Sequence, residues 1–530
     1  MARHHPITLT GINHPSESWS MPDLPEARSV ERNPSQSRLR ELALAVMPRI
    51  TVTEFGNLNY RAEVTARLKK STFFVSDTEI HQNRIPRAEA EEWAARQDAH
   101  IATRDMLLIE GYIGPAAELR TGCQLYIESA QPNIAAMQGQ LYFPADRDWA
   151  PELTVIYTPT LGAEGKSDDR LIIADLESGV TRVLGSDYFG ESKMGGLRMW
   201  NRLVYDHGGI ALHAGLKTFP PESTRSAEEE SMLIIGLSGT GKTTTTFRQQ
   251  AGSLPVQDDF VALMPHGVVH TTEAGCFAKT YGLDPEEEPI IYGGTTRPDA
   301  WLENVSVTPD RKVDFFDTSY TANGRCTFPM ANIPHRDPRS VPPARYLLIL
   351  NRSENVIPAV ARLQRHQIPA YFMLGETKGT SAGGAAEAGK SLRVPGTNPF
   401  FFEDDSLQGN RLLELLETVP DLEAFVLNTG RVGGNGEGSK DVRIPDSSAI
   451  VQGIVEGTID WTVDHDFGYE IASAVPGVDD IELLQPRLLY ERLGRSSDYE
   501  ATVARLKKER VEYLADFPAL DPSIPDGLGG

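Results

Sequence analysis

Short apolar runs separated by polar turns recur along the chain and predict a mixture of strands and helices. Apolar runs of about four to eight residues are typical of buried strands. They occur, with a few polar flanking positions, at residues 73–77, 153–159, 232–235, 346–350 and 425–428. Apolar positions with helical spacing predict amphipathic helices at residues 38–46, 411–417 and 499–513. We therefore expect an α/β fold class, mixed in the α+β sense.

Turn-rich and charged stretches divide the chain into three predicted parts. Residues 1–36 are rich in Pro, Ser, Asn and charge, which predicts a disordered arm. A segment with prolines and a run of charges at residues 218–230 predicts a surface break. We expect an N-terminal domain over residues 37–225 and a C-terminal domain over residues 226–530. The Gly/Ala/Ser-rich stretch at residues 375–391 predicts either a mobile loop or the start of an Ala-rich helix.

Composition excludes several classes of partner. The chain has 530 residues and a formal net charge of −23, so a nucleic-acid partner or an anionic membrane surface is not expected. No apolar run approaches the roughly 18 residues of a membrane span, and the first residues lack the apolar core of a signal peptide. The three cysteines have no metal-binding spacing and suit a reducing compartment. We expect a soluble cytoplasmic protein, for which a monomer is compatible with the sequence.

The strongest local motif follows the apolar run at residues 232–235. It fits the pattern G-x-x-x-x-G-K-[ST] of a phosphate-binding loop and continues into a helix-compatible run of threonines. The residues concerned are Gly236, Leu237, Ser238, Gly239, Thr240, Gly241, Lys242, Thr243 and Thr244. The glycines let backbone N–H groups converge on phosphate oxygens, and the following helix adds its dipole. Lys242 would contact the β- and γ-phosphates, and Thr243 would bind Mg²⁺ through its hydroxyl. The alternative is a glycine-rich turn without a ligand.

Two adjacent acids, Asp258 and Asp259, end a short strand-like run just after this loop. Paired carboxylates beside a polyphosphate suit a hard divalent cation. Taken alone, the pair would more simply be a solvated turn. Beside a phosphate loop, we interpret it as part of a metal site.

Further segments point to a site for a second substrate. They contain Tyr188, Glu191 and Lys193 in one stretch, then His213, Lys279, Glu303, Arg325 and the glycine-rich run at residues 428–436. Together with the form of the loop, GLSGTGKTT, this ordered set resembles the ATP-dependent phosphoenolpyruvate carboxykinase family. The matches cover roughly half of the chain well.

The resemblance implies a two-domain fold with the phosphate loop in the C-terminal domain and a reaction of gluconeogenesis. Oxaloacetate and ATP would give phosphoenolpyruvate, ADP and CO₂. Decarboxylation forms an enolate, whose oxygen then takes the γ-phosphoryl group. The family uses Mn²⁺ near the enolate and Mg²⁺ on the nucleotide.

The resemblance also implies roles for individual residues. His213 and Asp259 would bind Mn²⁺, with Asp258 beside them as an outer partner or a partner of Mg²⁺-bound water. Ser238, Lys242 and Arg325 would contact the transferred phosphate. The remaining implied positions are nucleotide-side Glu303 and substrate-side Arg67, Tyr188 and Lys193.

The chain departs from the family pattern at one position and in two segments. The family has two lysines after the glutamate that matches Glu191, and the second binds Mn²⁺, whereas this chain has Lys193-Met194. A thioether is a poor ligand for a hard cation, so either Lys193 takes the metal role, or water does, or the reaction differs. The segment around Arg67 lacks the usual Gly-Arg-Ser-Pro pattern. The adenine-side segment is replaced by the stretch at residues 375–402, which could still act as a lid near 375–395.

These departures leave two alternatives beside the carboxykinase. One is a P-loop kinase of the same fold that acts on another small molecule or on a protein, and the other is a nucleotide-binding regulatory module. The conjunction of His213, Asp259 and Arg325 disfavours a module that only binds a nucleotide.

Since ATP and oxaloacetate are anions, the negative net charge must lie outside a locally positive cleft. Lysine is scarce, with 13 residues in the chain, which makes Lys193 and Lys242 stand out.

Overall fold

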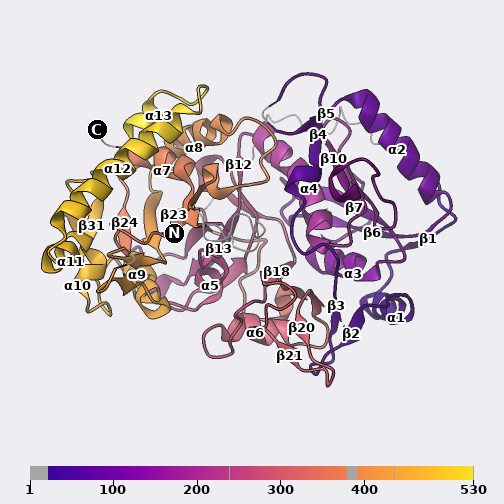
Figure 1. Cartoon of the computed structure of the whole chain (residues 1–530), viewed down its shortest axis with the longest axis horizontal. Helices are drawn as coiled ribbons and strands as arrows, with labels where there is room; N and C mark the ends of the chain where they lie inside the picture. The colour runs from indigo at the N-terminus through magenta and orange to yellow at the C-terminus, as the bar shows by residue number, and fades with distance from the viewer. Residues whose placement is uncertain (1–21, 81, 238, 379–390, 435, 529–530) are drawn as a thin grey trace, which may run out of the picture.

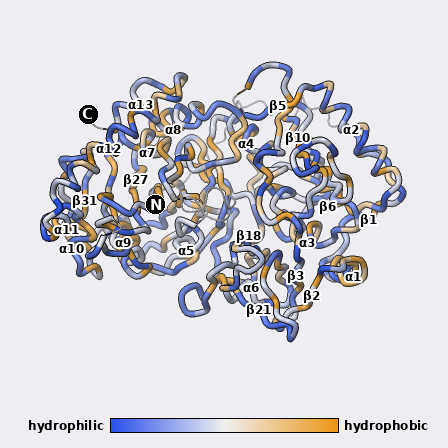
Figure 2. Tube along the Cα trace, in the orientation of Figure 1, coloured by the Kyte–Doolittle hydropathy of each residue, from blue (hydrophilic) through white to orange (hydrophobic). Residues whose placement is uncertain are grey.

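The computed structural model describes residues 22–528, except 81, 238, 379–390 and 435. Figure 1 shows two lobes joined through a smaller layer near the bottom of the view. Hydrophobic segments run through both lobes, whereas the outer loops carry many hydrophilic positions (Figure 2). The mixed α/β fold class is confirmed. Within the described part of the chain, no helix combines the length and apolar character needed to span a membrane.

The first lobe is built on a nine-stranded sheet with the strand order β1-β6-β7-β9-β11-β10-β4-β5 and with β8 beside β6. Its strands are β1 Ser29–Arg32, β4 Thr72–Val75, β5 Arg84–Ile85, β6 Asp105–Ile113, β7 Thr121–Glu128, β8 Phe143–Pro144, β9 Leu153–Thr158, β10 Leu171–Asp175 and β11 Val180–Leu184. Its helices are α1 Gln36–Val46, α2 Arg87–Ile101, α3 Pro132–Leu141 and α4 Phe189–Asp206. Helix α4 carries Lys193 and packs on β9 and β11.

The second lobe contains an eight-stranded sheet with the order β15-β13-β14-β23-β27-β24-β31-β30. Its strands are β13 Ala214–Phe219, β14 Glu230–Ile235, β15 Leu254–Gln257, β23 Ala344–Asn351, β24 Val360–Arg362, β27 Glu423–Asn428, β30 Asp460–Val463 and β31 Glu470–Ala474. The three central strands β14, β23 and β27 are parallel. Their carboxyl ends therefore lie at one edge of the sheet, the place where open α/β sheets bind ligands.

Helices on both sides bury this second sheet. They are α5 Lys242–Phe247, α7 Ile368–Leu374, α8 Ser406–Thr418, α9 Ile444–Glu456, α10 Ile481–Leu484, α11 Pro486–Arg492, α12 Ser496–Ala515 and α13 Ser523–Asp526. The central parallel strands β14, β23 and β27 are mostly apolar and nearly all of their residues are buried, as expected of parallel strands covered on both faces. Two separate apolar clusters lie on opposite faces of the sheet, one containing Ile235 and Val426 and the other containing Ile234 and Phe425.

Smaller sheets connect the lobes and cross the predicted domain boundary. The five-stranded sheet has the order β18-β22-β19-β3-β2, and β12, β16 and β17 form another. The bounds are β2 Ile50–Val52, β3 Leu58–Tyr60, β12 Ile210–Leu212, β16 Val261–Leu263, β17 Val269–Thr271, β18 Gly275–Lys279, β19 Trp301–Glu303 and β22 Arg325–Pro329, with α6 Pro289–Thr295 beside them. Strand β3 pairs in parallel with β19, so early and late parts of the chain share one sheet.

Several predicted elements are confirmed, and one differs. All five predicted strands overlap β4, β9, β14, β23 and β27, and the three predicted helices overlap α1, α8 and α12. The predicted disordered arm lies partly in residues 1–21, outside the described residues. Beyond them, Ser29–Arg32 is the edge strand β1, in parallel register with β6. Ion pairs of Arg28 with Asp105 and of Arg32 with Glu110 stabilise it. Most of the predicted lid, residues 379–390, also lies outside the described residues.

Candidate active site

A cavity of about 1150 Å³ lies at the carboxyl edge of β14, β23 and β27 and brings most of the predicted site residues together. From the predicted set its lining contains Arg67, Tyr188, Lys193, His213, Leu237, Gly239, Thr240, Gly241, Lys242, Thr243, Thr244, Asp258, Asp259 and Arg325. Gly236 and Glu303 are not among the lining residues, and Ser238 lies outside the described residues. Segments far apart in sequence therefore converge on one space.

The phosphate loop connects β14 directly to α5, as the motif predicts. Gly239 and Gly241 have φ of 88° and 89°, a left-handed conformation that favours glycine. A side chain at Gly236 would place its Cβ 2.5 Å from the Thr240 hydroxyl, so this position also requires glycine. Helix α5 begins at Lys242, which points its free N–H groups and positive dipole end toward the loop.

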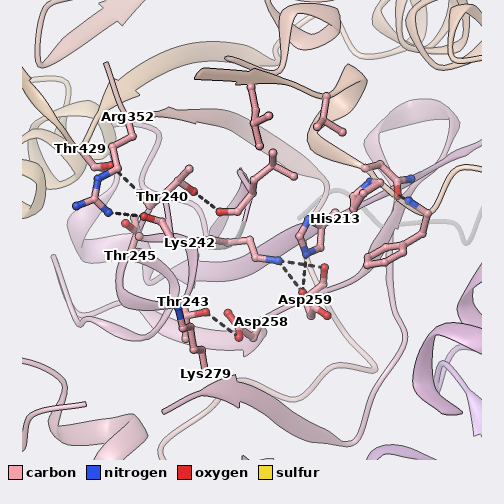
Figure 3. Close-up of a pocket in the computed structure, with 18 of the residues that line it drawn as sticks. His213, Thr240, Lys242, Thr243, Thr245, Asp258, Asp259, Lys279, Arg352 and Thr429 are labelled. Atoms are coloured by element: carbon pink, nitrogen blue, oxygen red, sulfur yellow. Dashed lines mark hydrogen bonds and ion pairs between the residues drawn. The ribbon is translucent and has the colours of Figure 1, made fainter. Parts of the chain in front are cut away.

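Neighbouring strand ends hold the loop from the side. The Thr429 hydroxyl, after β27, donates to the Thr240 carbonyl at 2.7 Å. Arg352, after β23, donates to the Gly239 carbonyl at 2.6 Å. Figure 3 shows both side chains beside the loop. The Gly239 and Thr240 carbonyls of the loop are thus bonded to side chains at the ends of the two neighbouring strands.

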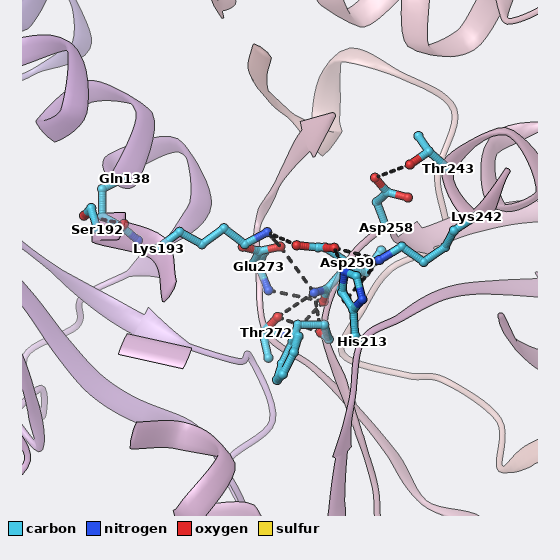
Figure 4. Close-up of polar contacts among 12 residues, drawn as sticks. Gln138, Ser192, Lys193, His213, Lys242, Thr243, Asp258, Asp259, Thr272 and Glu273 are labelled. Carbon is cyan, nitrogen blue, oxygen red and sulfur yellow. Dashed lines mark hydrogen bonds and ion pairs between the residues drawn. The ribbon is translucent and has the colours of Figure 1, made fainter. Parts of the chain in front are cut away.

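One carboxylate, Asp259, gathers three partners. Its Oδ1 lies 2.7 Å from Lys242 Nζ and 2.9 Å from His213 Nε2, and its Oδ2 lies 2.6 Å from Lys193 Nζ. Figure 4 shows Lys193 reaching this carboxylate from α4 while Lys242 approaches from the opposite direction. Burial alone would raise the pKa of Asp259, but Lys193, Lys242 and His213 hold it well below its usual range. Asp259 is therefore an anion that joins both lobes.

Lys193 also contacts a second buried acid. Its Nζ lies 3.0 Å from Glu273 Oε1. Burial would lower the pKa of Lys193, but Asp259 and Glu273 together raise it above the usual value. Burial raises the pKa of Glu273 to about 7, although Lys193 opposes the shift. Lys193 is therefore an ammonium ion within a network of two carboxylates.

The imidazole of His213 faces Asp259 in a way that suits a cation. Its Nδ1 lies 3.0 Å from the Thr397 carbonyl, which can only accept a hydrogen bond, so Nδ1 carries the proton. Burial and Lys242 lower the pKa of His213, so the ring is neutral and Nε2 presents a lone pair. This lone pair faces a carboxylate oxygen at 2.9 Å, next to the Lys242 ammonium that contacts the same oxygen, so the two acceptors together form a donor set for a cation. His213 and Asp259 thus fit a divalent metal ion.

Asp258 and Thr243 form a neighbouring pair. The Thr243 hydroxyl donates to Asp258 Oδ2 at 3.0 Å. The other oxygen of Asp258 is buried and has no hydrogen-bond partner among the described residues, and burial raises the pKa of Asp258 to about 6. An unsatisfied buried carboxylate oxygen is costly, so this pair suits a metal-bound water or a cation on the nucleotide. In the described part of the chain, no three His, Cys, Asp or Glu side chains surround one point, so lysine, phosphate or water would have to complete either site.

Basic residues line the opposite wall. Lys279 on β18 and Arg325 on β22 are register partners, and both line the cavity. Burial together with the charges of Arg325 and Arg352 lowers the pKa of Lys279 to about 8. On the first-lobe side the Arg67 guanidinium lies 5.6 Å from the centre of the Phe400 ring. Tyr188, fixed by a hydrogen bond from Tyr157 to its carbonyl, also lines the cavity.

Comparison with known proteins gives the family. A family model described as phosphoenolpyruvate carboxykinase matches residues 28–481. The chain belongs to the phosphoenolpyruvate carboxykinase family. A protein of Aeropyrum pernix named phosphoenolpyruvate carboxykinase (ATP) is 33% identical over 407 residues, which cover 74% of this chain and 78% of that protein. Proteins of the same name from Mesorhizobium japonicum and Brucella melitensis are 29% and 28% identical, over 87% and 97% of this chain and 86% and 96% of their own lengths.

The structure shows where two residues of this carboxykinase family member lie: Met194, which departs from the family pattern, and Glu303. Met194 is buried and lines the cavity next to Lys193, and it is Lys193 that reaches Asp259. Glu303 is buried behind the wall, where its Oε1 accepts a hydrogen bond from the Phe189 backbone N–H at 2.8 Å. Burial raises the pKa of Glu303 to about 8. Glu303 thus supports the segment that carries Tyr188 and does not face the cavity.

Several residues in the carboxykinase cavity had no role in the sequence-based prediction. They are Lys279, Arg352, Phe400 and Thr429, and Glu273 lies behind the lining as a partner of Lys193. Glu273 and Lys279 lie in a segment that the sequence already marked, and the scarcity of lysine could have singled out Lys279. Arg352 and Thr429 are each the first residue after a buried strand, which is the remaining signal for their position.

Proposed function

We propose that this protein is an ATP-dependent phosphoenolpyruvate carboxykinase that converts oxaloacetate and ATP to phosphoenolpyruvate, ADP and CO₂. The observation that carries the proposal is the convergence of Lys193, His213 and Lys242 on the single carboxylate of Asp259, directly beside a phosphate loop. A site that only bound a nucleotide would not need a neutral histidine and a second lysine on the same acid. Both half-reactions would occur in one cavity.

The phosphate end would hold ATP. The N–H groups of the loop, the start of α5 and Lys242 would bind the β- and γ-phosphates, with Ser238 on the γ-phosphate. Thr243 and Asp258 would hold Mg²⁺ on the nucleotide. Arg325, from the opposite wall, would stabilise the charge on the γ-phosphoryl group as it moves.

The substrate end would hold oxaloacetate. Arg67 and Tyr188 would orient its carboxylates, and His213 and Asp259 would hold Mn²⁺. Lys193 would join them as a third ligand only as the neutral amine, after the ion displaces its proton. When bound, this ion supplies positive charge to the enolate oxygen that decarboxylation creates. The Thr397 carbonyl keeps the His213 proton on Nδ1, so that Nε2 stays available for the metal.

The two predicted domains would each supply one end of the cavity. Residues 37–225 would form the substrate side, and residues 226–530 the nucleotide side with the phosphate loop. The cavity concentrates Arg67, Lys193, Lys242 and Arg325 in a chain of net charge −23. Capture of anionic substrates would therefore depend on this local positive site and on metal ions, in a protein that we expect to be cytoplasmic.

The test is an assay of purified protein with ATP, oxaloacetate, Mg²⁺ and Mn²⁺ in which phosphoenolpyruvate is measured. We expect the product with wild-type protein and a loss of at least about a hundredfold in Lys242→Ala, because the loop lysine contacts the transferred phosphate. Lys508→Ala is the matched control, since that side chain is 74% exposed on α12. The proposal fails if no phosphoenolpyruvate forms, or if Lys242→Ala behaves like Lys508→Ala.

A further inference from the structure

The end of β23 places an arginine against the phosphate loop. Strands β14 and β23 pair in parallel, with Ile235 opposite Ile349, and β23 and β27 pair with Asn351 opposite Asn428. Parallel strands end at the same edge of a sheet. The residues that follow the strands, Gly236, Arg352 and Thr429, therefore meet at one place.

Arg352 and Thr429 contact the loop in different ways. Thr429 uses its hydroxyl hydrogen on the Thr240 carbonyl at 2.7 Å, which satisfies its one donor. Arg352 uses Nη1 on the Gly239 carbonyl at 2.6 Å. A guanidinium has five N–H donors in a planar fork, so a single carbonyl uses only part of its capacity. Figure 3 shows Arg352 on the side of the loop away from Asp259, with Lys242 extending toward Asp259.

The charges around the loop indicate which ligand the other N–H groups of Arg352 could bind. Arg352 lines the same cavity as Lys279 and Arg325, and the charges of the two arginines contribute to the lowered pKa of Lys279. Like charges gathered around one space repel each other, and a bound polyanion removes that cost. Meanwhile the ammonium groups of Lys193 and Lys242 both contact Asp259, which offsets part of their charge. The phosphates thus need cations from another direction.

We propose that Arg352 is a phosphate-binding residue whose guanidinium contacts the polyphosphate of the nucleotide from the Gly239 side of the loop, opposite Lys242. The proposal rests on the proposed ATP site and adds a residue to it. Because Arg352 is bonded to the Gly239 carbonyl of the loop, its position relative to the bound phosphates does not depend on the transferred γ-phosphate. It therefore contacts ATP and ADP alike. It therefore contributes to nucleotide affinity more than to the phosphoryl-transfer step.

Three variants separate charge on phosphate from simple support of the loop. Arg352→Gln keeps an N–H donor for the Gly239 carbonyl but has no charge, Arg352→Lys keeps the charge without the fork, and Arg352→Ala has neither. Arg147→Ala is the control, because that side chain is 92% exposed. Dissociation constants for ATP, ADP and AMP are measured by titration calorimetry with Mg²⁺, and kcat and KM for ATP are measured in parallel.

We expect Arg352→Ala and Arg352→Gln to bind ATP and ADP about 10- to 100-fold more weakly than wild type, the usual effect of losing a charged hydrogen bond. Arg352→Lys should lose less, and AMP binding should change little. KM for ATP should rise with kcat within a few-fold of wild type. The inference is overturned if Arg352→Gln binds ATP like wild type, or if AMP weakens as much as ATP. If wild-type protein binds ATP but forms no phosphoenolpyruvate, the proposed function fails while the Arg352 result stands.

Discussion

The two ends of the cavity are built on opposite principles. At the phosphate end, one continuous loop, the residues after β23 and β27 and the opposite wall supply many separate donors, from the N–H groups of the loop to Arg325, Arg352 and Thr429. At the substrate end, Asp259 alone links Lys193 of α4, His213 after β12 and Lys242 of α5. A distributed site should lose function gradually when donors are removed. A site centred on one carboxylate should lose most of its function when that single residue is changed.

The largest effect is expected from Asp259→Asn. Neutralising this carboxylate leaves two buried ammonium groups without their shared partner, which costs about 3–5 kcal/mol in the free energy of unfolding. Formation of phosphoenolpyruvate should fall at least about a thousandfold, since the metal and Lys242 lose a common anchor. Both are measured, by urea titration and by product assay.

The control for this change is Asp206→Asn at the exposed end of α4, where Asp206 pairs with Arg202. A solvent-exposed pair contributes at most about 1 kcal/mol, and activity should stay at the wild-type level. The comparison breaks if Asp259→Asn is as mild as Asp206→Asn.

The next effect tests which of two neighbouring residues serves the substrate end. In Lys193→Met the ammonium that contacts Asp259 and Glu273 is lost, and we expect about a hundredfold loss in kcat/KM for oxaloacetate. Met194→Lys should change activity less than about tenfold, because Lys193 already reaches Asp259 at 2.6 Å. Mn²⁺ affinity, followed by electron paramagnetic resonance, should fall in the first variant and hold in the second. If the double variant that combines Lys193→Met with Met194→Lys equals wild type, this assignment is contradicted.

At the phosphate end, removing a side chain that only supports the loop backbone should be mild. Thr429→Val removes the hydrogen bond to the Thr240 carbonyl and leaves every other donor in place. A net loss of about 1 kcal/mol corresponds to roughly a fivefold higher KM for ATP. Thr458→Val, at an exposed position after α9, serves as the control. A loss in Thr429→Val as large as in Asp259→Asn would show that the two ends are not built differently.

The smallest effect on catalysis, and a distinct effect on stability, is expected at Lys217 beneath α5. Its Nζ donates to the carbonyls of Thr245 and Arg248 at 2.9 and 2.7 Å and also contacts Gln250. Burial lowers the pKa of Lys217 to about 7. Above pH 7 the unfolded chain holds this proton and the folded chain gives it up, so the stability of the wild type rises with pH.

The variant Lys217→Met removes this titration. The free energy of unfolding of the wild type relative to Lys217→Met should therefore increase by up to about 2 kcal/mol between pH 7 and pH 9. Lys508→Met, on the exposed surface of α12, should show a constant difference over the same range. A constant difference for Lys217→Met as well would mean that its folded pKa is not lowered.

The phosphate end was the more predictable from sequence, for a physical reason. Its nine residues from Gly236 to Thr244 are contiguous, and the glycine conformations that the loop requires are encoded locally. Strands such as β14 and β23 were equally visible as apolar runs, because parallel strands buried on both faces contain few polar residues. Family resemblance also marked Asp259 and His213.

The other contacts in the site depend on how helices and strands are placed relative to one another in the fold. That Lys193 and Lys242 share one carboxylate follows from how α4 and α5 are placed, which no local pattern records. Arg352 and Thr429 reach the loop only because β23 and β27 end beside β14. The pairing of β3 with β19 likewise joins segments on opposite sides of the predicted domain boundary.

The most direct test of the account is a single-turnover measurement of all three products, with excess protein, limiting ATP and oxaloacetate labelled in the carboxyl group that is lost. If one cavity centred on Asp259 couples both steps, phosphoenolpyruvate, ADP and labelled CO₂ will form in equal amounts and at one rate. All three will be lost together in Asp259→Asn. Release of CO₂ without phosphoenolpyruvate, or ATP turnover that ignores oxaloacetate, would contradict it.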